Sequence, residues 1–99
     1  MKRRNPLVAR NAYELAQILD LSAADAQAMT FQLQLARRII QEVSRRKLTH
    51  AQAAQLAGTS RSRMTAILNG NVLDVSTDLL LRILASFGLR AKVSFSRAA

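Results

Sequence analysis

The stretch Thr49–Gly70, THAQAAQLAGTSRSRMTAILNG, decides the fold, because it carries the signals of two short helices joined by a tight turn. Thr49 and Gln52 form a Thr-x-x-Gln capping box, a pattern that begins a helix. Gly58 supplies the left-handed residue that ends this helix, and Ser60 is a favourable N-cap for the next one. The spacing therefore predicts one helix between Thr49 and Gly58 and a second helix that starts after Ser60.

The second helix has two different faces. Apolar residues at i, i+3 and i+4 form its buried face, namely Met64, Ile67 and Leu68. The opposite face carries hydrogen-bond donors at the helix N-terminus: Arg61, Ser62, Arg63 and Thr65. Small alanines in the first helix allow the second to cross it closely. This combination predicts a helix-turn-helix, whose second helix places its N-terminal residues against base edges in the major groove.

The pair Asn69-Gly70 allows another interpretation, because Asn-Gly between apolar runs is also a hairpin signal. The preceding run has the period of a helix rather than that of a strand, and glycine commonly follows a helix end. We therefore predict a helix followed by a loop.

The segment Leu48–Gly70 resembles the helix-turn-helix of the Cro-like, phage-repressor-type family (the XRE family). The family pattern Ala-x-x-x-Gly-x-Ser is matched by Ala54-Gln55-Leu56-Ala57-Gly58-Thr59-Ser60, and Asn69-Gly70 matches its polar residue plus glycine. A long upstream helix, the run Ser76–Leu89 and a terminal strand extend the resemblance to the HigA-like antitoxin branch. The resemblance implies a lambda-repressor-like fold and a RelE-like ribonuclease toxin as partner. It also implies a protein that represses its own operon.

Composition limits the function further. A chain of 99 residues with 49% hydrophobic residues is sufficient for one globular domain, and 4% aromatics predict an aliphatic, alanine-rich core. There is no cysteine and His50 is the only histidine, so the sequence offers no nucleophile–base pair and no histidine-based metal cluster. We expect no enzyme activity, no cofactor and no metal, in a cytoplasmic protein associated with the nucleoid.

The charge indicates an anionic partner. The net charge is +9, and the range from Val43 to Leu73 contains basic residues but no acid. A solvated face would normally mix both signs, so nucleic acid is the favoured partner. No apolar run approaches the ~20 residues that span a bilayer, so we expect no membrane contact.

Residues 1–24 are predicted to form an N-terminal basic arm and a short helix, and residues 25–99 the DNA-binding domain. The arm, with Lys2, Arg3 and Arg4, either follows DNA phosphates or the minor groove or is a solubilising tail. The short helix would run from an Asn11 cap to about Asp20.

Ser22 and Asp25 should open a long helix that reaches about Lys47. Two apolar ladders run along it: Met29, Leu33, Ala36, Ile40 and Val43 form one, and Phe31, Leu35 and Ile39 form the other. One domain needs roughly one 100° stripe, so we expect the N-terminal helix or a toxin to cover part of this surface. At the helix end, Arg45 and Arg46 either contact phosphate or compensate the helix dipole.

Three further positions are candidates for contact with the DNA backbone. By the resemblance, His50 lies where such repressors often touch a phosphate, although an exposed residue at a helix start is an equal alternative. Asn69 and Asn71 can donate to the backbone, although turn formation alone would explain them.

After a last helix capped by Ser76, residues 90–96 alternate between apolar and polar side chains, which predicts a strand. A lone strand leaves its backbone groups unpaired, so it should pair with a symmetry mate or with the sheet edge of another protein. A coil packed on the last helix is the alternative.

The sequence therefore predicts an all-α, five-helix, lambda-repressor-like domain with a C-terminal strand that pairs across a dimer bound to a palindromic operator. A free-standing repressor without a toxin and a basic protein or RNA interaction module are the alternatives. Arg61 and Arg63 are the leading candidates for base or phosphate contact, and the full predicted set is Ser60, Arg61, Ser62, Arg63, Thr65, His50, Asn69, Asn71, Arg45 and Arg46.

Overall fold

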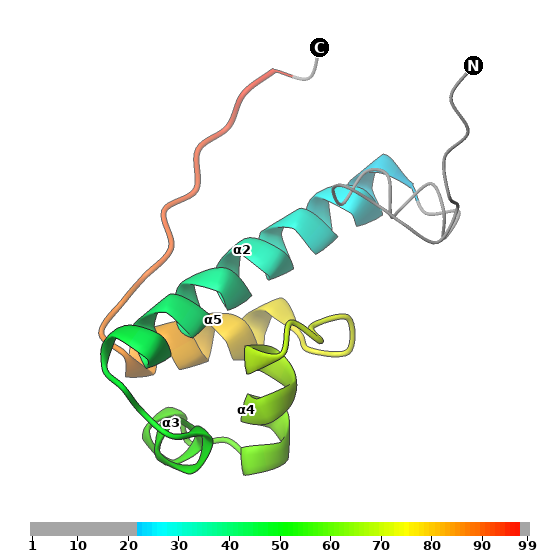
Figure 1. Ribbon diagram of the computed structural model, residues 1–99. Coiled ribbons are helices and arrows are strands. Elements are labelled where there is room, and N and C mark those ends of the chain that lie inside the picture. Colours follow the sequence, from blue (N-terminus) through cyan, green and yellow to red (C-terminus); the bar gives the residue numbers. More distant parts are fainter. Residues whose placement is uncertain (1–21, 98–99) are drawn as a thin grey trace, which may run out of the picture.

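The computed structural model describes residues 22–97, and within this range the regular structure is helical (Figure 1). The helices are α2 (Ala23–Arg45), α3 (His50–Ala57), α4 (Arg61–Leu68) and α5 (Thr77–Ser86). The predicted all-α character is confirmed for this part of the chain. The N-terminal arm and the short helix from Asn11 lie outside the described residues, so the fifth helix stays a prediction.

Each described helix begins at the cap that the sequence predicts. Ser22 and Asp25 form a capping box on α2, and Thr49 and Gln52 form another on α3. The hydroxyls of Ser60 and Ser76 accept hydrogen bonds from amides three residues later, at the starts of α4 and α5. These caps satisfy amides that have no acceptor within the helix, which is why the starts are fixed locally.

The helix ends share one geometry, in which a left-handed residue allows two amides to bond back to the last turn. Gly58 has φ +69° at the end of α3, where its amide and that of Thr59 donate to carbonyls of the helix. Lys47 takes the same position after α2 with φ 54°, although it is not a glycine. The long helix therefore ends at Arg45, two residues before the predicted end.

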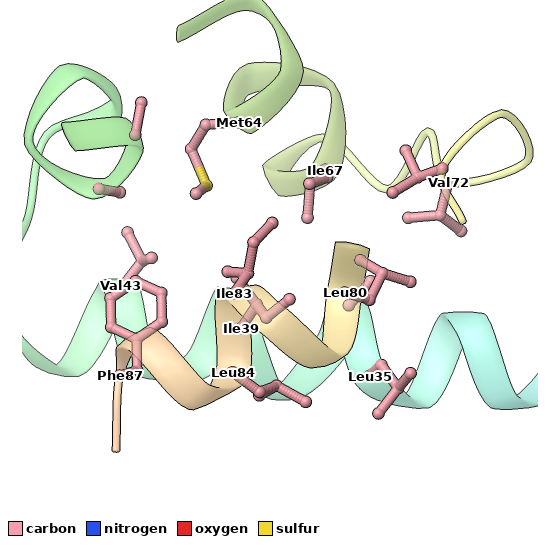
Figure 2. Close-up of a cluster of buried hydrophobic side chains, with 14 residues drawn as sticks. Leu35, Ile39, Val43, Met64, Ile67, Val72, Leu80, Ile83, Leu84 and Phe87 are labelled. Carbon is pink, nitrogen blue, oxygen red and sulfur yellow. The ribbon is translucent and has the colours of Figure 1, made fainter. Parts of the chain in front are cut away.

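The core lies where α2 and α5 run side by side and α3 and α4 pack beneath them (Figure 1). Figure 2 shows Met64 and Ile67 of α4 directed toward Ile39 of α2 and Ile83 of α5. All four side chains are fully buried. Because α4 is packed through these residues, its opposite side faces away from the described core.

The two predicted ladders of α2 do not form two faces. One buried stripe takes residues from both ladders: Leu35, Ala36, Ile39 and Val43. Leu33 remains 41% exposed, because at 100° per residue it lies about 120° around the helix from the fully buried Ile39. The exposed apolar surface predicted for α2 is therefore limited to the edge of this buried stripe, at Leu33.

Residues 90–97 form no strand in the structure. The segment leaves the end of α5 and runs away from it (Figure 1), with Val93 63% and Phe95 94% exposed. A strand needs a hydrogen-bonding neighbour, and the described part of this single chain offers no sheet edge. The segment does not match the alternative of a coil packed on α5 either. Among the described helices, none has the length and apolar character needed to cross a bilayer.

Candidate nucleic-acid interface

Helices α3 and α4 form a compact pair connected by Gly58, Thr59 and Ser60. Ala53 of α3 and Met64 of α4 are fully buried where these helices pack. The small side chain of Ala53 lies in this interface, where the sequence predicts a close crossing of the two helices. The pair is a helix-turn-helix, in which the first helix supports the second.

The exposed side of α4 has a centre and two flanks. At 100° per residue, Met64 and Ile67 point into the core, so Ser62 and Ala66 lie at the centre of the opposite side. Arg61 lies on one flank, and Arg63 lies on the other. Arg61, Ser62 and Arg63 are all exposed. The predicted recognition residues are therefore brought together on one surface, with its two guanidinium groups on opposite edges.

Ser60 is used as a cap. Its hydroxyl accepts a hydrogen bond of 3.0 Å from the Arg63 amide. The first amides of a helix have no acceptor within it, so the start of α4 presents N–H groups beside Arg61 and Ser62. This arrangement suits contact with a phosphate.

His50 and Thr65 are in direct contact. The Nδ1 atom of His50, at the start of α3, lies 2.9 Å from the Thr65 hydroxyl oxygen in α4. Both side chains are half-buried. The sequence singled out both residues but did not predict that they bond to each other across the helix-turn-helix.

Asn69 and Asn71 lie at the other end of α4. Their amides donate to the carbonyls of Thr65 (3.0 Å) and Ala66 (2.9 Å), which closes the helix. Both residues are exposed. These backbone hydrogen bonds form the turn that ends α4, as the turn interpretation requires. Contact of the two side chains with DNA stays a prediction.

Arg45 and Arg46 are bound to a buried acid that the sequence analysis did not identify. Glu42 is 2% exposed, and it forms ion pairs with Arg45 and, at 3.2 Å, with Arg46. Arg46 also donates to the Phe87 carbonyl (2.6 Å), and its guanidinium lies over the Phe87 ring. Arg46 therefore joins the ends of α2 and α5, whereas the Arg45 side chain remains 68% exposed.

The hydrogen bond from Arg45 lowers the pKa of Glu42 below its ordinary value, and Arg46 adds to the effect against the opposing influence of burial. The charged form of Glu42 is thus the one that the structure stabilises. A sequence signal for this cluster existed. Arg38, Arg45 and Arg46 stand at the helical spacings i−4, i+3 and i+4 from Glu42, which itself falls in the apolar stripe.

Two other residues were missed. Gln32 of α2 donates to the Val75 carbonyl at 2.7 Å and so holds the loop between α4 and α5. No local pattern predicts this contact, because the two residues are 43 positions apart. Ala66 is half-buried and lies beside Ser62 on the side of α4 that faces away from the core.

The fold and this surface define a helix-turn-helix DNA-binding protein. The chain belongs to a helix-turn-helix domain family, whose model matches residues 18–96. No curated protein and no solved structure matches this sequence.

Proposed function

We propose that the protein is a transcriptional repressor that binds a specific DNA sequence with α4 in the major groove. The observation that carries this proposal is the exposed side of α4, which presents Arg61 and Arg63 within a range, Val43–Leu73, that contains no acid. Arginine forms bidentate hydrogen bonds with guanine and also pairs with phosphate. The surface therefore offers both the positive charge that supplies affinity and the donors that distinguish bases.

The operator is palindromic and the protein binds it as a homodimer. The C-terminal segment supports this part of the proposal, since Val93 and Phe95 are exposed on an extended backbone. Two such segments can pair as antiparallel strands and bury these side chains. A dimer binds two half-sites with an effective-concentration advantage that a monomer lacks.

The test is quantitative binding to the DNA upstream of the gene, followed by footprinting. We expect a protected palindrome and an affinity that falls steeply with salt, because counterions are released from phosphates. An unrelated duplex of equal length is the control. Equal affinity for both duplexes would refute sequence-specific recognition, and no binding to either at low salt would refute DNA binding.

A second candidate function is that of the antitoxin of a RelE-like ribonuclease toxin, with XRE-type, HigA-like organisation and repression of its own operon. Exposure of Phe95 and Leu33 favours it, because apolar side chains of this size on a surface suit a protein partner. A free-standing repressor is the alternative, and a basic module that binds an acidic protein or RNA is a further one. Co-expression with the adjacent gene distinguishes them, since only the antitoxin reverses growth arrest caused by that gene.

A further inference from the structure

We infer that His50 determines which bases Thr65 can recognise, by fixing the direction of the hydrogen bond between them. The inference rests on the proposed function, in which α4 lies in the major groove. Its structural basis is the 2.9 Å contact between His50 Nδ1 and Thr65 Oγ1, which joins the first residue of α3 to α4.

The bond has two possible directions in the neutral ring. A neutral imidazole has one N–H donor and one acceptor, and a threonine hydroxyl has one donor and two lone pairs. If Nε2 carries the proton, Nδ1 accepts from the threonine hydroxyl. If Nδ1 carries the proton, it donates to the threonine oxygen, and the hydroxyl proton remains free.

DNA selects between these states. Phosphate oxygens are acceptors only, so a phosphate near Nε2 requires Nε2–H, and in the neutral ring Nδ1 then carries no proton and accepts that of Thr65. His50 is half-buried, it stands in the acid-free range, and its Nδ1 faces Thr65, so Nε2 is the ring nitrogen left for the DNA backbone. The protein–DNA complex therefore holds Thr65 as a hydrogen-bond donor toward His50.

Thr65 then has only lone pairs left for a base. In the major groove, adenine N6 and cytosine N4 are donors, whereas guanine O6 and N7 and thymine O4 are acceptors. Thr65 lies on the same flank of α4 as Arg61, one turn further along the helix, so it can reach a neighbouring base pair. Thr65 accordingly favours adenine or cytosine at its contact and disfavours guanine or thymine.

The test measures affinity for operator variants that carry each base at each position, at about pH 8.5, where imidazole is usually neutral. Thr65→Val, which keeps the shape and removes the hydroxyl, identifies the position that Thr65 contacts. In the parent protein, this position should prefer adenine or cytosine by about three- to tenfold. His50→Ala should reduce that preference, because the hydroxyl can then donate as well as accept. His50→Lys, a side chain that only donates, should shift the preference toward guanine or thymine. Thermal unfolding of each variant checks that the fold is intact.

Two results would overturn the inference while leaving the proposed function in place. One is a preference at this position that His50→Ala and His50→Lys leave unchanged, even if they weaken all sequences equally. The other is a Thr65→Val variant that alters no base preference. Failure of the parent protein to prefer any operator would instead refute the proposed function itself.

Discussion

Removing the guanidinium groups of α4 should weaken DNA binding without weakening the fold. The exposed side chains of Arg61 and Arg63 form no ion pair with any residue between 22 and 97, so Arg61→Ala and Arg63→Ala should change the free energy of unfolding by less than about 0.5 kcal/mol. An arginine that reads a base contributes about 1–3 kcal/mol to binding, which corresponds to about a 5- to 150-fold loss of affinity.

Because the two residues lie on opposite flanks of α4, their losses should differ in kind. A base contact, when removed, relaxes specificity at one position, whereas a phosphate contact weakens all sequences and lowers the salt dependence by about one unit. Fluorescence anisotropy at several salt concentrations, with operator variants, separates these effects.

Arg82→Ala is the matched control, because it removes an exposed arginine from α5, outside the helix-turn-helix. If both α4 variants bind the operator as tightly as this control does, α4 is not the recognition helix.

Three further outcomes are expected. Truncation after Leu89 should convert the proposed dimer to a monomer and lower operator affinity, and a dimer that persists in sedimentation would place the interface elsewhere. Glu42→Gln should lower the melting temperature, because the neutral amide cannot form the ion pairs that Glu42 makes with Arg45 and Arg46. Since the folded pKa of Glu42 lies below its ordinary value of 4.5, its contribution is present above that value and is lost as the pH falls through the folded pKa. The difference in melting temperature between the parent and Glu42→Gln should therefore shrink at acid pH. A difference that stays constant with pH would contradict this role of Glu42. Lys47→Gly should stabilise the protein by about 0.5–1 kcal/mol, measured in urea against Lys47→Ala, because glycine adopts a positive φ at no steric cost.

The sequence by itself determined where the described helices begin and approximately where they end. Caps such as Ser22 and Thr49 act on amides three residues away, so their effect can be identified without knowing the fold. The net charge of +9 and the acid-free range are properties of composition, and they indicated the class of ligand before any geometry was known.

Tertiary structure decided what depends on contacts between distant residues. The sequence could place Glu42 among arginines, but only the packing of α5 on α2 buries it and brings Arg46 to the Phe87 carbonyl, 41 positions away. The predicted strand is absent from the single chain for a related reason, because its alternation is encoded locally, whereas a strand exists only beside a neighbour. Its pairing across a dimer stays a prediction. Likewise, His50 and Thr65 are 15 positions apart and on different helices. Their hydrogen bond exists only because α3 packs against α4, which brings the start of one helix beside the other.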